Sequence, residues 1–297
     1  MIWVSWRQHR AEAIAGLGLL GALAVYAAVL GLSMRSSFGH DNLATCLARS
    51  QGAGCPNSVY SFMNSFGSLV NIGFWAVLLL LPGLIGVVAG APLLGRELEM
   101  GTWRLAWSQT VPRTRWLVVT LAVVGGGLLV LGAAMTLVIT WYRAPMDRLT
   151  GHFIHNAYDY EGLVFTAYIL CAFGLAVLAG QVLRRSIPAM IAALVPWLAI
   201  RIVVEFVLRP HFMAPLTFTR TCTNGCAQGD GLASVPPATR HIGDLVISFG
   251  GTGNAQLTHY QPASRFWEFQ SIEAGIFVAL TLAALGTAVW LLHRRAA

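Results

Sequence analysis

Long stretches without a charged side chain alternate with short polar segments along this chain. No charged residue occurs at positions 50–95 or 116–142. A helix that crosses a bilayer needs about 20 mainly apolar residues. Six segments meet this requirement: residues 13–34, 69–94, 117–142, 163–183, 187–208 and 272–292. The pattern predicts an all-α integral membrane protein with six transmembrane helices in a single domain, residues 1–297.

Composition supports this class and excludes others. The chain is 56% hydrophobic and only 10% charged, whereas a soluble domain carries about 25% charged residues. All 19 basic residues are arginine. Without lysine the chain cannot form the phosphate-binding loop GxxxxGK[ST], whose lysine contacts the phosphates. The net charge of +7 is distributed as membrane topology requires, so no nucleic-acid partner is expected.

The arginines indicate an orientation. Ten lie in very short segments on one side of the predicted membrane: Arg7, Arg10, Arg96, Arg104, Arg113, Arg115, Arg184, Arg185, Arg294 and Arg295. Eight lie in longer loops on the other side: Arg35, Arg49, Arg143, Arg148, Arg209, Arg220, Arg240 and Arg265. Acidic residues nearly neutralise only the second set. Because cytoplasmic loops carry the excess of arginine, both termini are predicted to be cytoplasmic.

Two segments stand outside the predicted spans. Residues 1–12, MIWVSWRQHRAE, place tryptophans beside basic side chains, which is typical of a short amphipathic helix at the inner membrane interface. Residues 209–270 form a large outer loop rich in glycine, proline and threonine. The end of this loop regains aromatic residues, so we expect part of it to cap the membrane domain or dip towards it.

The cysteines suggest two small disulfide loops. Cys46 and Cys55 lie in the first outer loop, Cys222 and Cys226 in the last, and Cys171 lies within the fourth span. Close pairs on an oxidising face favour the disulfides Cys46–Cys55 and Cys222–Cys226. Free thiols remain an alternative.

A metal site is the other alternative for the last cysteine pair, with His211 or His241 as a further ligand. The spacing of these residues matches no standard zinc motif, so no metal is predicted.

The connector between the second and third spans is unusually rich in ions. Residues 95–116 contain both acidic and basic side chains, and Pro112 ends the helix that they predict. An ordinary positive-inside loop with an aromatic anchor explains the arginines. It does not require the acids Glu97 and Glu99 or a Gly-Thr break.

Three segments of the chain resemble a known family. The run GRELEMGTWRLAWSQTVPRTRWL is similar to the signature of ABC type-2 exporter permeases, especially the six-span actinobacterial kind. YQPASRFWEFQSIEAGIFVAL resembles the last outer segment and final helix of that group, and WVSWRQHRAE resembles its amphipathic start. Order and spacing match along nearly the whole chain, although residues 35–60 and 209–255 carry no usable resemblance.

The resemblance implies a transport subunit without enzymatic activity in the cell membrane. It moves an amphipathic substrate outwards and binds no cofactor; ATP and Mg²⁺ bind two copies of a separate ATPase. A second permease chain, identical or different, would face the first, with an identical one expected. Residues 95–116 would form the coupling helix that docks on the ATPase, through Arg96, Glu97, Glu99, Gly101, Thr102 and Arg104.

The family also places the translocation path between the second and fifth spans. Polar or aromatic residues at helical spacing share one face near the second span: Asn64, Ser68, Asn71 and Trp75. They either line the path or form hydrogen bonds between helices. The fifth span contributes Trp197, Arg201 and Glu205. Arg201 and Glu205 are four residues apart, so they form either a mutual ion pair or part of a gate.

Two other functions compete with this one. The segment GHFIHNAYDYEG, residues 151–162, offers His152, His155, Asp159 and Glu161 on the outer side, as a membrane-embedded enzyme with a metal or acid–base site would. A solvated loop is the interpretation that we prefer for it. A passive channel is the third reading, although no filter-like motif or ring of charges supports it.

Overall fold

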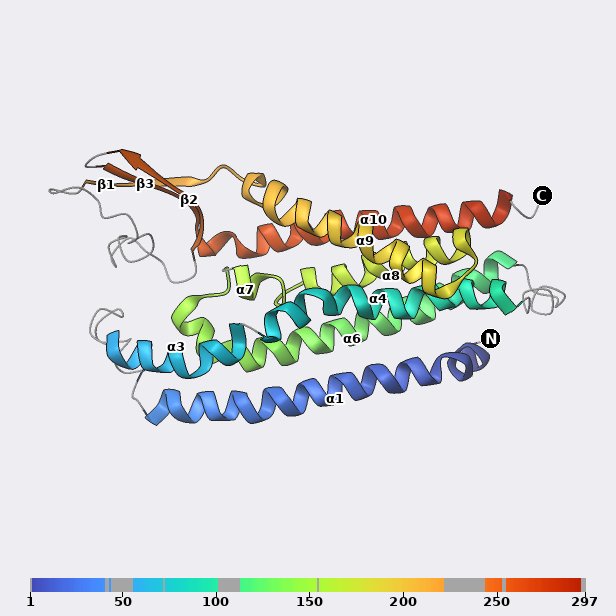
Figure 1. Ribbon diagram of the computed structural model, residues 1–297, viewed down its shortest axis with the longest axis horizontal. Helices are drawn as coiled ribbons and strands as arrows, with labels where there is room; N and C mark the ends of the chain where they lie inside the picture. Colours follow the sequence, from blue (N-terminus) through green and yellow to red (C-terminus); the bar gives the residue numbers. More distant parts are fainter. Residues whose placement is uncertain are drawn as a thin grey trace.

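The structure is a computed structural model that describes residues 2–40, 43, 56–71, 73–100, 113–153, 155–221, 244–252 and 255–294. Long helices lie roughly parallel in an elongated bundle, and a small β-sheet lies beyond one end of it (Figure 1). The predicted disulfides Cys46–Cys55 and Cys222–Cys226 lie outside the described residues.

The long helices have the following bounds: α1 Ile2–His40, α3 Pro56–Asn71, α4 Gly73–Met100, α6 Arg113–Thr150, α8 Val164–Leu183, α9 Ser186–Val203 and α10 Phe266–Arg294. The short elements are α7 His155–Tyr158, the π-helical turn η1 Val204–Leu208, and the 3₁₀ turns η2 Arg209–His211 and η3 Ala263–Arg265. The strands are β1 Leu216–Thr221, β2 Leu245–Thr252 and β3 Ala255–Gln261.

Five of the described helical segments are long and apolar enough to cross a membrane. They are Gly16–His40, Arg115–Thr150, Val164–Leu183, Ser186–His211 and Ala263–Arg294. They correspond to five of the six predicted spans, so the multi-pass helical class is confirmed. The predicted second span falls on α4, where the described apolar stretch is Leu79–Leu93. The sixth crossing therefore stays a prediction.

Two helices are longer than expected. The predicted interfacial helix, residues 1–12, is continuous with the first span, because α1 is helical from Ile2 to His40. Helix α6 continues eight residues beyond the predicted end at Tyr142, to Thr150. Arg143 and Asp147 lie on this extension and pair at i, i+4, an interaction that stabilises helical structure.

Helix α8 is the centre of the bundle. It packs against α4, α6, α9 and α10, and most of its side chains are buried. Glycines in α4 allow the closest approach. A Cβ atom added at Gly90 would lie 2.7 Å from the carbonyl oxygen of Phe173, and one at Gly86 would lie 2.7 Å from the Phe173 amide nitrogen. Small residues of this kind let helix backbones approach closely in membranes.

The large outer loop contains a sheet that the sequence analysis did not predict. The strand order is β1-β3-β2 and both pairings are antiparallel, with Leu216 opposite Tyr260 and Val246 opposite Tyr260. The all-α expectation is therefore wrong for the three strands β1, β2 and β3. Alternation of threonine with leucine and phenylalanine in β1 (LTFTRT) suits a pleated strand, but a single short run of this kind is a weak signal.

Different helix ends and strands lie at the two ends of the bundle. The start of α1, the end of α10, the end of α4 and the start of α6 lie at one end (Figure 1). Helix α3 and the sheet lie at the opposite end. This arrangement agrees with an even number of crossings.

Candidate functional site

A network of buried ions lies where α7, α8, α9 and α10 meet. Its central acid is Asp159, in the turn after α7, which is 1% exposed. One carboxylate oxygen accepts a hydrogen bond from Arg209 at 2.6 Å, and the other accepts one from Arg201 at 3.1 Å. Burial alone would raise the pKa of Asp159, but the guanidinium groups of Arg209 and Arg201 outweigh it and lower the pKa. Asp159 is therefore ionised.

Glu273 is the second acid of this network and is fully buried near the start of α10. Arg209 donates to both of its carboxylate oxygens, from Nε at 3.0 Å and from an Nη atom at 2.9 Å. The Tyr168 hydroxyl donates to Glu273 at 2.5 Å. Two arginines thus face two carboxylates in these hydrogen bonds, and the buried Glu205 carboxyl interacts electrostatically with the same groups.

Arg201 connects this network to α4. It donates a hydrogen bond to the carbonyl of Leu79 at 2.5 Å, and its guanidinium lies 4.5 Å from the centre of the Tyr168 ring. Trp197, one turn earlier on α9, donates from Nε1 to the carbonyl of Tyr168 at 3.1 Å. Gly83 of α4 leaves room for the Trp197 ring. These contacts hold α9 against both α4 and α8.

The predicted ion pair between Arg201 and Glu205 does not form among the described residues. Within the described part of the chain, the ion-pair partner of Arg201 is Asp159, and Glu205 makes no ion pair with it. Both residues are buried. The α-helix ends at Val203 and a π-helical turn begins at Val204. The wider turn changes the angular spacing on which an i, i+4 pair depends.

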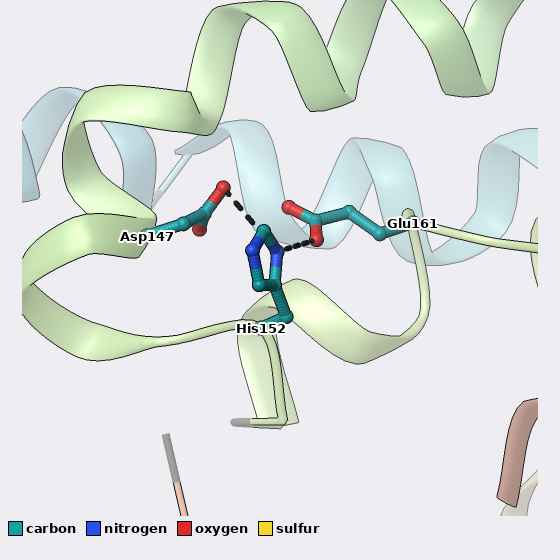
Figure 2. Close-up of side chains that lie close together, drawn as sticks. All are labelled: Asp147, His152 and Glu161. Carbon is teal, nitrogen blue, oxygen red and sulfur yellow. Dashed lines mark hydrogen bonds and ion pairs between the residues drawn. The ribbon is translucent and has the colours of Figure 1, made fainter. Parts of the chain in front are cut away.

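A second polar cluster, the Asp147–His152–Glu161 cluster, lies at the end of α6 (Figure 2). The His152 Nδ1 atom is 2.5 Å from Glu161 Oε2 and 3.7 Å from Asp147 Oδ2. Arg143 donates to the other oxygen of each acid, at 3.2 Å in both cases. The hydrogen bond to Glu161 raises the pKa of His152, and partial burial opposes that rise.

The interpretation of residues 151–162 as a solvated loop is therefore wrong for the two acidic side chains in this segment. Asp159 and Glu161 are buried, whereas the His152 side chain is 52% exposed. The acids are buried because three arginines accompany them, which makes burial of charge possible. The side chain of His155 lies outside the described set.

The other predicted site residues are only partly described. Asn64 is exposed on α3, and Trp197 is fully buried. Ser68 and Asn71 lie on α3 and Trp75 on α4, but their side chains are outside the described set. The same holds for Arg96, Glu97 and Glu99 near the end of α4, and Gly101, Thr102 and Arg104 lie outside the described residues altogether. Their roles stay predictions.

Sequence reasoning missed three members of the buried network. Arg209 was assigned to the outer loop, Glu273 was not assigned a partner, and Tyr168 was read only as part of an apolar span. The available signal was an acid, Glu273, in the predicted sixth span and an arginine, Arg209, directly after the predicted fifth span. Nothing in their spacing indicates that they meet.

Comparison with known proteins gives one match. The sequence model of a family described as ABC-2 membrane transporter related matches residues 17–209, which is more than half of the chain. The matched region runs from α1 to the first residue of η2 and includes Asp159, Arg201 and Arg209. Searches of curated proteins and of solved structures found no match.

Proposed function

The chain belongs to the ABC-2 membrane transporter related family, and on this premise we propose that it is the permease subunit of an ATP-driven exporter. It moves an amphipathic substrate, such as a drug, a lipid or a peptide-like molecule, out of the cytoplasm or the inner leaflet. ATP and Mg²⁺ bind to a separate ATPase subunit, present in two copies. The family match is the observation that carries this proposal.

The distribution of arginines supports the orientation that export requires. At the end of the bundle that holds the α8–α9 turn, Arg115, Arg184, Arg185 and Arg294 are exposed, and none makes an ion pair among the described residues. At the opposite end, the buried arginines are paired with carboxylates. Short loops rich in arginine mark the cytoplasmic face, so in this proposal the α4–α6 connector faces the ATPase.

The connector joins two long helices directly. Helix α4 ends at Met100 and α6 begins at Arg113, and α4 packs against α8 and α9. A displacement of the connector by a soluble motor is therefore transmitted to the centre of the bundle. We assign docking on the ATPase to Arg96, Glu97, Glu99, Gly101, Thr102 and Arg104, because ion pairs fix the register of such an interface.

A homodimer completes the translocation path. Helix α9 exposes a row of large apolar side chains, including Ile187, Ile191 and Val195, which suits lipid or a second copy of the chain. The path then runs between α4 and α9 of the two copies. Asn64, Ser68, Asn71 and Trp75 line it, and Trp197, Arg201 and Glu205 control its outer end.

The coupling role can be tested by reconstitution. The chain is co-expressed in turn with each stand-alone ABC ATPase of its own genome, and assembly and ATP hydrolysis are measured in lipid nanodiscs. The double variant E97A/R104A is expected to weaken assembly by at least about tenfold, because truncating a desolvated interface charge costs about 2–5 kcal/mol.

R294A is the matched control, since it removes an exposed arginine at the same end of the bundle but outside the connector. It is expected to assemble like the parent chain. Equal assembly and equal ATP hydrolysis in E97A/R104A and R294A would contradict the coupling role. Substrate movement that needs no ATP would contradict the exporter as a whole and favour a channel.

A further inference from the structure

The Asp147–His152–Glu161 cluster has the composition of a metal site. It offers one imidazole nitrogen and two carboxylate oxygens, and these three atoms all lie within 4.8 Å of one another. They come from the end of α6, from the segment that follows it, and from the turn before α8. Zn²⁺ accepts both imidazole nitrogen and carboxylate oxygen as ligands, and three protein ligands leave a fourth position open for water. Mg²⁺ and Ca²⁺ prefer oxygen ligands alone.

Asp147 provides a second, independent observation. Its Oδ2 atom is buried and accepts no hydrogen bond from any described residue, although it faces the imidazole in Figure 2. An unpaired buried carboxylate oxygen is costly. A proton on His152 Nδ1 makes a hydrogen bond to Glu161 Oε2, which is 2.5 Å away. Asp147 Oδ2 lies 3.7 Å from the same nitrogen and is too distant to accept a hydrogen bond from it. A bound cation satisfies both acids together.

Arg143 orients the two acids for this role. It donates to Asp147 Oδ1 and Glu161 Oε1, so the free oxygens, Oδ2 and Oε2, both face His152. Support of the second oxygen of a ligating carboxylate is a common feature of metal sites. With both acids ionised and His152 neutral, which are the forms that bind a metal, the formal charges of Arg143 and the two acids sum to −1. The exposed side of His152 provides access to solvent.

From these contacts we propose that Asp147 Oδ2, His152 Nδ1 and Glu161 Oε2 bind one divalent cation of the zinc type at the outer end of α6. Zinc lies about 2.0–2.2 Å from such ligands, which sets neighbouring ligands about 3.4 Å apart. The 3.7 Å separation from Asp147 is close to that value. The separation from Glu161 is shorter, so the half-exposed imidazole moves about 1 Å away from Glu161 when the metal binds. The cation then fastens α6 to the segment that leads into α8.

Metal binding by the full-length chain tests this site directly. The purification tag is removed and the thiols are alkylated, so that neither competes for metal. Zn²⁺ is then titrated calorimetrically, and Co²⁺ is used as a spectroscopic probe of coordination. The parent chain is expected to bind one Zn²⁺, and D147N and H152Q are expected to bind it at least tenfold more weakly. Zn²⁺ is expected to raise the unfolding temperature of the parent more than that of D147N or H152Q.

H211Q is the matched control, because His211 is exposed beyond the end of α9 and contributes nothing to the cluster. It should bind Zn²⁺ like the parent chain. His152 is half-exposed, so H152Q is expected to fold normally, and its unfolding temperature in a chelator verifies this. Zinc affinity that is the same in H152Q, D147N and the parent, or no binding by the parent, overturns the proposal. Neither result affects the exporter assignment, because no ATPase takes part in the measurement.

Discussion

Arg209 lies between two carboxylates, Asp159 and Glu273, that are far apart in the sequence. All three side chains are almost completely inaccessible to solvent. A buried ion pair adds little net stability when compared with a well-packed apolar pair, but removal of one partner leaves an uncompensated charge and costs about 3–5 kcal/mol. The stability of the region where these residues meet α10 therefore depends strongly on each acid.

Replacement of Glu273 by glutamine tests this dependence. E273Q leaves Arg201 and Arg209 with Asp159 as their only carboxylate in the network, so the buried group gains a net positive charge. We expect the unfolding temperature of the purified chain in detergent to fall by roughly 5–10 °C. Differential scanning fluorimetry measures it.

Glu268 is the natural control because it lies on the same helix and is exposed. E268Q should change the unfolding temperature by less than about 2 °C. Equal shifts in E268Q and E273Q would show that the buried network is not stabilising.

The sequence indicated which charges were unusual at this scale, but not which ones meet. Arg201 was recognised as a charge inside a span. Its partner, Asp159, lies on a different segment, and the expected partner, Glu205, falls within the π-helical turn. Local spacing predicts pairs only within a regular helix. Pairing across elements depends on packing, which one sequence does not display.

At the scale of elements, the contact between α4 and α8 depends on the absence of side chains. Gly86 faces Ala172 and the backbone of Phe173. Membrane helices gain little from the hydrophobic effect when they pair, so close van der Waals contact and interhelical hydrogen bonds hold them together. The carbonyl of Leu79, which accepts from Arg201, lies two turns before Gly86 on the same helix. A wider α4–α8 separation would therefore also disturb the buried network.

Replacement of Gly86 by alanine is expected to force these helices apart. A Cβ atom there would lie 2.7 Å from the Phe173 nitrogen, and overpacking of this kind costs about 1–3 kcal/mol. The unfolding temperature should fall by roughly 2–8 °C, with a smaller monodisperse fraction in size-exclusion chromatography.

Gly127 on α6 provides the comparison. A Cβ atom at this position meets nothing within 4 Å in the described part of the chain. G127A should be neutral or slightly stabilising, because alanine favours helix. A loss of stability in G127A equal to that in G86A would mean that the α4–α8 contact is not the cause.

The helices were predictable because long apolar runs without charges leave few alternatives. The end of α6 and the sheet were not. Arg143 and Arg148 resembled a polar loop, but the pairing of Arg143 with Asp147 and Glu161 lets the helix continue. Strands β2 and β3 pair up to Thr252, which lies opposite Ala255. The threonine-rich and glycine-rich segments that form the sheet carry too little hydrophobic alternation to predict strands from one sequence.

At the scale of the whole molecule, the described arginines at one end of the bundle are exposed, whereas at the other end three are buried and paired with acids and Arg148 is exposed. The turn between α8 and α9 contains Arg184 and Arg185, both exposed. In η2, beyond the far end of α9, Arg209 is buried between two acids. The positive-inside rule counts arginines in short loops and near the ends of the spans. Arg209 lies within the apolar helical segment Ser186–His211 and does not count as a loop charge; the orientation itself stays a prediction.

Fusions at the two ends of α9 test the orientation of the whole chain. A chain truncated after Arg185 and fused to green fluorescent protein should fluoresce, because this reporter folds only in the cytoplasm when it follows a secreted segment. The same chain fused to alkaline phosphatase should be inactive. A chain truncated after Met213 should give the opposite pair of results, since it contains one more crossing. Matching results at both positions would mean that α9 does not cross the membrane, and reversed results would put the α4–α6 connector outside, where no ATPase could drive it.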